Sequence, residues 1–175
     1  MSRGQTQPQE RVVPFQDLIG APLHIALIEP QIPPNTGNIA RLCAATGCAL
    51  HLVEPLGFRI DDRELKRAGL DYWEGVRLTI HRSLDDFLAA TSTVRRWFFS
   101  THAVRRYNDA AYAHGDWLVF GKETAGLPPA VLSQHADCAL RIPMLTGGVR
   151  SLNLSTAVGV VTYAALERFG FPDLA

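Results

Sequence analysis

Lysine is scarce in this chain of 175 residues, because only Lys66 and Lys122 occur and arginine carries almost all of the positive charge. The formal net charge is zero, with 17 basic and 17 acidic residues, which excludes a polycation that coats nucleic acid by bulk charge. Any contact with RNA must therefore come from a local patch. The planar guanidinium of arginine suits the clamping of phosphate groups, although a biased genome composition produces the same preference.

Cysteine and long apolar runs are scarce as well. Cys43, Cys48 and Cys138 form no C-x-x-C pair, which argues against a disulfide framework or a zinc site and favours a reducing compartment. The histidines lack metal-ligand spacing, so we expect no metal. No apolar run approaches the roughly 20 residues that span a bilayer, and no apolar stretch follows Arg3 as in a secretory signal. We expect a cytoplasmic protein that contacts no membrane.

The hydrophobic content of 47% is enough for a sizeable core in one domain. Residues 1–21 are polar, and we expect a mobile arm there; residues 22–175 form the single domain. Short apolar runs alternate with segments of helical spacing, which predicts an α/β fold with a mainly parallel sheet and helices on both faces. The predicted strands are 23–29, 50–54, 76–81, 96–101, 117–121 and 138–142, and the predicted helices between them are 38–46, 61–67, 84–90 and 128–134.

The last helical segment, about 153–169, is apolar nearly all round. A surface helix would show a polar stripe, so we expect this helix to be buried on more than one side. Two interpretations remain open: a central helix of the core, or a helix that packs against both its own sheet and a second subunit.

Ligands of open α/β sheets bind beyond the carboxyl ends of the strands, so the loops after strands are the places to look for chemistry. The first such loop, 29–41, contains three prolines, of which Pro33 and Pro34 stiffen the approach, and Asn35 or Thr36 can cap the helix that follows. Asn38 and Arg41 are three residues apart and project from one helix face. A capped helix with a solvated arginine explains this loop equally well.

Two later loops carry more polar groups than a turn needs. In the loop 120–128, Gly121 permits a close approach of backbone, and Glu123 can accept a hydrogen bond from a ligand. The loop 141–155 carries Arg150 beside a glycine pair, followed by three possible helix caps where one is enough: Ser151, Asn153 and Ser155. This surplus predicts a ligand cradle.

Taken together and in this order, the three loops resemble the signature motifs of the SpoU-type branch of the SPOUT RNA methyltransferases. The strings N-T-G-N-I-A-R-L-C-A at 35–44, K-R-A-G-L-D-Y-W at 66–73 and R-S-L-N-L-S at 150–155 are similar to the TrmL-type tRNA ribose methyltransferases. The resemblance implies that the C-terminal segment threads a loop to form a deep trefoil knot, which a pattern-based prediction would reject because knots are rare. It also implies a homodimer with its cofactor pocket near the interface.

The activity that the resemblance implies is methyl transfer from S-adenosyl-L-methionine to the ribose 2′-hydroxyl of the tRNA wobble nucleotide, a cytidine or a modified uridine, in leucine tRNAs. Arg41 would assist loss of the hydroxyl proton, with Asn35 and Glu123 holding it and Asn153 ordering the third loop. Because the pKa of a guanidinium lies above about 12, we expect Arg41 to contact a substrate phosphate and orient the hydroxyl rather than act as a base. The implied cofactor contacts are Ser100, Thr101, Gly121, Ile142 and Ser151.

The charged run 59–67 is either a solvated helix face or an element that faces RNA. The resemblance of the string after it favours RNA. The candidate contacts with an anticodon stem-loop are then Arg63, Lys66, Arg67 and Arg150 for phosphates, and Tyr72 or Trp73 for a splayed base.

Two other functions stay open. The first is the same chemistry on another tRNA position or on ribosomal RNA, although relatives that act on large RNA commonly carry an additional domain. The second is a knotted RNA-binding protein without turnover. One departure from the family bears on the cofactor loop, because His102-Ala103-Val104 stands where relatives often have Lys or Gly.

Overall fold

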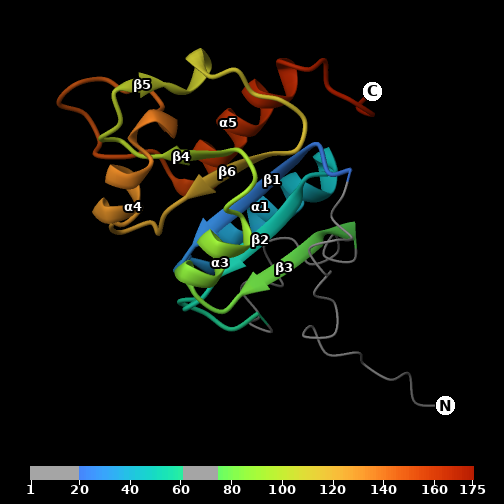
Figure 1. Ribbon diagram of the computed structural model, residues 1–175, viewed down its shortest axis with the longest axis horizontal. Coiled ribbons are helices and arrows are strands. Elements are labelled where there is room, and N and C mark those ends of the chain that lie inside the picture. The colour runs from blue at the N-terminus through green and yellow to red at the C-terminus, as the bar shows by residue number, and fades with distance from the viewer. Residues whose placement is uncertain (1–19, 61–74) are drawn as a thin grey trace.

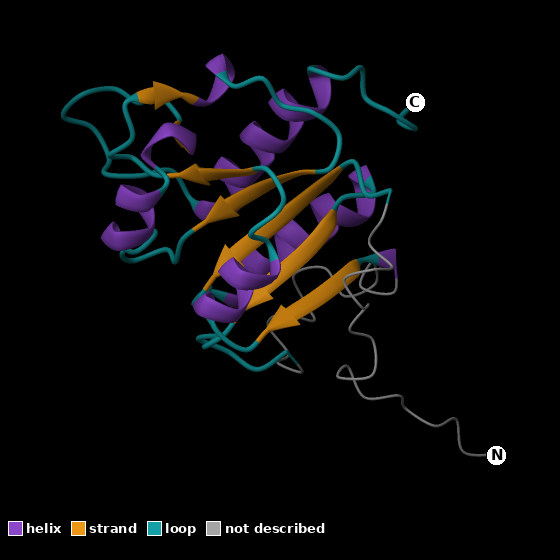
Figure 2. Cartoon of the chain, viewed as in Figure 1, coloured by secondary structure: helices purple, strands orange, loops and turns teal. Residues whose placement is uncertain are grey.

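The protein is described here from a computed structural model, which describes residues 20–60 and 75–175. Within these ranges seven strands form one sheet in the order β3-β2-β1-β6-β4-β7-β5, and every registered pair is parallel (Figures 1 and 2). The predicted α/β class and parallel sheet are confirmed. The strands are β1 (Leu23–Ile28), β2 (Ala49–Val53), β3 (Arg77–His81), β4 (Arg96–Phe99), β5 (Arg105–Arg106), β6 (Asp116–Phe120) and β7 (Ala139–Arg141).

The helices lie on both faces of this sheet. They are α1 (Pro33–Thr46), α3 (Leu84–Ala90), α4 (Pro129–Gln134) and α5 (Leu154–Glu167), with short 3-10 turns η4 (Tyr107–Asp109) and η5 (Ala136–Cys138). The predictions for α3 and α4 agree with the structure to within one residue. The predicted helix 61–67 and all of the predicted arm except residues 20 and 21 lie outside the described residues.

The start of α1 corrects one prediction. The helix begins at Pro33, with Ile32 as its N-cap, so Asn35 and Thr36 lie inside the first turn and do not cap it. The physical reason is that proline is well tolerated in the first turn, where its missing N–H would have no helical partner anyway.

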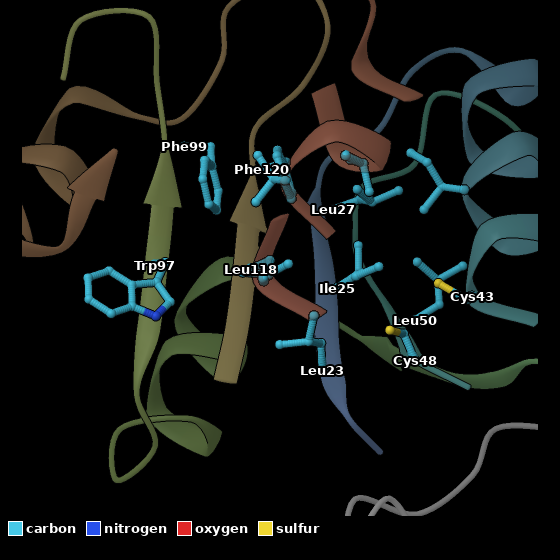
Figure 3. Packing of buried hydrophobic residues seen from close by; sticks show 14 of the residues in the cluster. Leu23, Ile25, Leu27, Cys43, Cys48, Leu50, Trp97, Phe99, Leu118 and Phe120 are labelled. Carbon is cyan, nitrogen blue, oxygen red and sulfur yellow. The ribbon is translucent and has the colours of Figure 1, made fainter. Parts of the chain in front are cut away.

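Alternate residues of each strand face opposite sides of the sheet, because strand side chains have a period of two. On one face, Leu23, Ile25 and Leu27 of β1 pack with buried residues of α1 and α5 (Figure 3). On the other face, Ala26 and Ile28 pack with Phe87 of α3 and Val131 of α4. All residues of β1 are buried, which explains why this strand appears in the sequence as a continuous apolar run.

Helix α5 packs against α1 and against β1 and β6, so it is buried on more than one side as predicted. Its outer side still exposes Val160 (38% exposed) and Tyr163 (48% exposed). The first interpretation, a helix wholly within the core, therefore leaves these two side chains unexplained.

The order of the last strands fits the trefoil knot that the resemblance implies. Strands β4 and β5 follow one another in the chain, yet β7 pairs with both and lies between them. The C-terminal part of the chain thus enters between two strands that precede it. Strand β5 was not predicted, because its two exposed arginines carry none of the apolar pattern of a strand.

Three histidines on neighbouring strands form a buried hydrogen-bonded chain. Nδ1 of His24 lies 3.1 Å from Nε2 of His51, and Nδ1 of His51 lies 3.2 Å from Nε2 of His81. Trp117 of β6 stacks on His24, with ring centroids 4.4 Å apart. A neutral imidazole offers one donor and one acceptor, so three uncharged rings can form both hydrogen bonds of this chain.

Burial disfavours the charged form of all three rings. Desolvation, with smaller contributions from Arg77 and His114, lowers the pKa of His24 to about 4. Desolvation also holds the pKa of His51 well below its ordinary value, assisted by His24 and His81. The pKa of His81 is lowered by desolvation, and the carboxylate of Asp86 opposes this shift.

We expect acid to destabilise the protein through this chain. Histidines of the unfolded chain titrate near pH 6.5, so the unfolding free energy should be insensitive to these groups above that pH. It should fall as the pH drops from about 6.5 towards about 4, by up to about 1.4 kcal/mol per pH unit for each histidine that remains neutral. Chemical denaturation at about pH 7 and about pH 5 measures the difference.

A variant isolates this contribution from that of the carboxylates. His51→Leu removes one proton taken up on unfolding and should reduce the loss of stability between the two pH values. His102→Ala, which changes an exposed histidine, should leave that loss as in the wild type. An acid-induced loss that is the same in all three proteins would contradict the role of the chain.

Candidate active site

A cavity of about 830 Å³ lies where β4, β6 and β7 end and α5 begins. This volume is within the range of sites for small molecules and cofactors, and the place agrees with the rule for parallel sheets. The cavity is lined by all five residues that the resemblance assigns to the cofactor: Ser100, Thr101, Gly121, Ile142 and Ser151.

The wall at Gly121 is made of backbone. A Cβ atom at this position would lie 2.0 Å from the carbonyl carbon of Gly126 and 2.2 Å from the amide nitrogen of Leu127. The loop folds back here, because Gly126 has a φ of +67° and its N–H donates to the carbonyl of Lys122 at 2.8 Å. Backbone beside an apolar wall of Leu127 and Ile142 suits the recognition of a flat base such as adenine, so these residues fit S-adenosyl-L-methionine.

One network of side chains joins the three loops that the sequence singled out. Oε1 of Glu123 accepts hydrogen bonds from Asn35 Nδ2 at 3.0 Å and from the N–H of Ile32 at 3.1 Å, and Oε2 accepts one from the N–H of Gln31 at 2.8 Å. Asn153 Nδ2 in turn donates to Asn35 Oδ1 at 2.9 Å. The loops after β1, β6 and β7 are therefore held together at one end of the cavity.

Asn153 has a second role as the N-cap of α5. Its Oδ1 accepts from the N–H groups of Ser155 at 2.9 Å and Thr156 at 3.3 Å, and from the hydroxyl of Ser155 at 2.7 Å. Of the three possible caps, the structure uses this one, which leaves Ser151 to line the cavity. One side chain thus starts the last helix and positions Asn35.

Arg41 is exposed on α1 and lies outside the set of residues that line the cavity. It follows Asn35 by six residues, which places the two side chains about 120° apart around the helix axis. Its contact with Asn35 and Glu123 stays a prediction.

Of the predicted RNA contacts, only Arg150 lies in the described part of the chain. Its side chain is exposed and lines the cavity rim. The others lie outside the described residues: Arg63, Lys66, Arg67, Tyr72 and Trp73.

The sequence reasoning missed two further links between the first two loops. Lys122 Nζ lies 2.6 Å from Oε2 of Glu29, and the hydroxyl of Thr124 donates to Oε1 of Gln31 at 2.6 Å. The available signal was the isolated Lys122 next to Glu123 in a chain with only two lysines.

The described residues form two ranges, 20–60 and 75–175. Neither range holds a group of three or more His, Cys, Asp or Glu side chains suited to binding a metal ion. Neither range holds a helix long and apolar enough to cross a membrane.

A parallel sheet with a ligand cavity at its carboxyl ends, a backbone wall and a polar network beside it define a cofactor-binding α/β protein. More specifically, the chain belongs to the SpoU rRNA Methylase family, whose model matches residues 22–163.

Individual relatives are similar to this chain over most of its length. A tRNA (cytidine(34)-2'-O)-methyltransferase from Burkholderia pseudomallei is 49% identical over 151 residues, which cover 85% of this chain and 96% of that protein. A structure solved for insight into the 2-OH methylation of C/U34 on tRNA has a TM-score of 0.79 at 47% identity, covering 84% of this chain and 95% of that one. An AdoMet-bound rRNA methyltransferase from Sinorhizobium meliloti has a TM-score of 0.78 at 25% identity, covering 90% and 61%.

Proposed function

We propose that this protein transfers a methyl group from S-adenosyl-L-methionine to the ribose 2′-hydroxyl of nucleotide 34 of tRNA, a cytidine or uridine. The relatives that share nearly half of its residues carry this activity in their names. The structural observation that carries the proposal is the Asn35–Glu123–Asn153 network, which ties the helix bearing Arg41 to the wall of the cofactor cavity.

The cofactor, when bound, supplies an electrophilic methyl group. Ser100, Thr101, Gly121, Ile142 and Ser151 would hold it in the cavity, where the backbone wall leaves room for it. The main task of the protein is then to align the ribose oxygen with the methyl group. Positioning of this kind can lower the activation barrier by on the order of 7–11 kcal/mol.

The ribose hydroxyl is a poor nucleophile and must lose its proton as the new C–O bond forms. Arg41 would contact a substrate phosphate and orient the hydroxyl. It would not act as the base, because a guanidinium stays protonated and has no site that accepts a proton. Asn35 and Glu123 fix the first turn of α1 against the loop after β6, and Asn153 fixes it against α5.

We further propose that the anticodon stem-loop is the part of tRNA recognised, and that leucine tRNAs are the substrates. Arg150 at the cavity rim would contact a phosphate near the reacting nucleotide. Arg63, Lys66 and Arg67 would contact further phosphates, and Tyr72 would stack on a base. Since tRNA is modified in the cytoplasm, we expect the protein there.

The test is methylation of purified tRNA by the purified protein with S-adenosyl-L-methionine, followed by mass spectrometry of the digested nucleosides. We expect a 2′-O-methyl group at nucleotide 34, and no transfer to a tRNA with a 2′-deoxy residue at that position. Methylation of ribosomal RNA instead would show that the same chemistry acts on a different RNA. Binding of tRNA without methyl transfer would show a knotted RNA-binding protein without turnover.

We also propose that the protein acts as a homodimer. Val160 and Tyr163 are exposed on the outer side of α5, where a second copy would cover them. Arg41 does not line the cavity of its own chain, and in a dimer it could reach the cavity of the second copy.

Tyr163→Glu is therefore expected to give a monomer of 19.2 kDa, where the wild type has twice that mass. The reason is that a carboxylate at the centre of an apolar interface must be desolvated without a partner. Sedimentation equilibrium measures the mass. Ala89→Glu, which changes an exposed residue of α3 on the opposite face of the sheet, is the control and should leave the dimer intact. A wild-type monomer would overturn this proposal.

A further inference from the structure

An ion pair joins the ends of the two central strands beside the cavity. Glu29 directly follows β1, Lys122 comes two residues after the end of β6, and these strands are neighbours in the sheet. The side chains are 27% and 33% exposed, so the pair is largely shielded from water. Lys122 also lines the cofactor cavity.

The pair belongs to a continuous set of links. Lys122, Glu123 and Thr124 are consecutive, and each bonds to the segment from Glu29 to the first turn of α1. Lys122 bonds to Glu29, Glu123 to Asn35 and to two backbone N–H groups, and Thr124 to Gln31. Of these three residues, only Glu123 is among the site residues that the family resemblance implied. The other two flank it and hold the same two loops together.

The backbone of Glu29 adopts a conformation that needs support. Its φ of +49° lies in the left-handed region, which is disfavoured for a residue other than glycine because the Cβ atom crowds the following carbonyl oxygen. Hydrogen bonds fix the loop on its other side, since the N–H of Glu29 donates to Val53 and the N–H of Gly57 donates to Pro30, both at 2.9 Å. The fixed backbone of this turn therefore positions the carboxylate of Glu29 against the ammonium group of Lys122.

We propose that Glu29 and Lys122 are positioning residues for methyl transfer. The ion pair sets the separation between the loop that leads to Asn35 and Arg41 and the loop that forms the cavity wall at Gly121. This inference rests on the proposed function. Because a misplacement of about 1 Å at a reacting centre can cost roughly 100-fold in rate, the pair acts on turnover rather than on cofactor affinity.

The experiment compares Glu29→Gln, Lys122→Met and the double charge swap Glu29→Lys/Lys122→Glu, with kcat and the KM for S-adenosyl-L-methionine measured on tRNA. Each single variant should lower kcat by at least about 10-fold and leave this KM within about 2-fold, which is the pattern of a lost transition-state alignment. The charge swap should recover most of the lost kcat.

The matched control is Arg95→Gln. Arg95 Nε lies 2.7 Å from Asp116 Oδ1, which is an ion pair at the opposite ends of β4 and β6 from the cavity. Breaking it should leave kcat unchanged.

Each outcome is decisive. If the wild type methylates tRNA and the single variants have the same kcat, the positioning role is overturned and the proposed function stands. The same conclusion follows if the charge-swap variant folds normally but regains no kcat. A wild type that does not methylate tRNA would overturn both.

Discussion

Replacing Arg41 by alanine is expected to lower kcat for methyl transfer by roughly 100-fold to 10,000-fold, the range for loss of a group that assists proton transfer. The affinity for S-adenosyl-L-methionine should stay at the wild-type value, because Arg41 is proposed to contact a phosphate of the tRNA and is not one of the five residues proposed to hold the cofactor. Single-turnover rates on tRNA and calorimetric titration with the cofactor measure the two quantities separately.

A second substitution at the same position tests the proposed chemistry. Arg41→Lys keeps a positive charge but loses the planar fork that binds a phosphate through two parallel hydrogen bonds. We expect it to retain more activity than alanine and less than the wild type. Arg82→Ala, which changes an exposed arginine after β3, is the control and should have no effect. Full activity of Arg41→Ala, or a loss confined to the KM for tRNA, would remove Arg41 from the chemical step.

The strands could be predicted because burial on both faces leaves a simple mark on the sequence. Strands β1 and β6 are buried throughout and mostly apolar, so their limits were found to within one residue. The errors fall where local chemistry outweighs pattern. Helix α1 begins five residues before the expected position because prolines occupy its first turn, and the two-residue β5 has no apolar pattern at all.

The site was predictable in its parts and not in its connections. Asn35, Glu123 and Asn153 were chosen from three separate loops, and the structure brings them into one network. The pairing of Glu29 with Lys122 joins residues 93 positions apart, and no local spacing encodes such a contact. The histidine chain shows the same limit, because its members meet only through the register of three parallel strands.

The close approach at Gly121 gives the second large expected effect. Gly121→Ala should weaken S-adenosyl-L-methionine binding by at least about 100-fold, because the new methyl group forces the backbone of residues 126 and 127 out of place and with it the cavity wall. Gly75→Ala is the matched control, since a Cβ at that position meets no atom within 4 Å. Calorimetric titration with the cofactor and with its demethylated product measures the loss.

Thermal unfolding separates a damaged wall from a damaged fold. A ligand at 100 times its dissociation constant stabilises the native state by about 2.7 kcal/mol, so the wild type and Gly75→Ala should melt at clearly higher temperature when saturated with cofactor. Gly121→Ala should show a cooperative transition that the same cofactor concentration does not shift. If this variant binds the cofactor as the wild type does, the cavity beside Gly121 is not where the methyl donor is held.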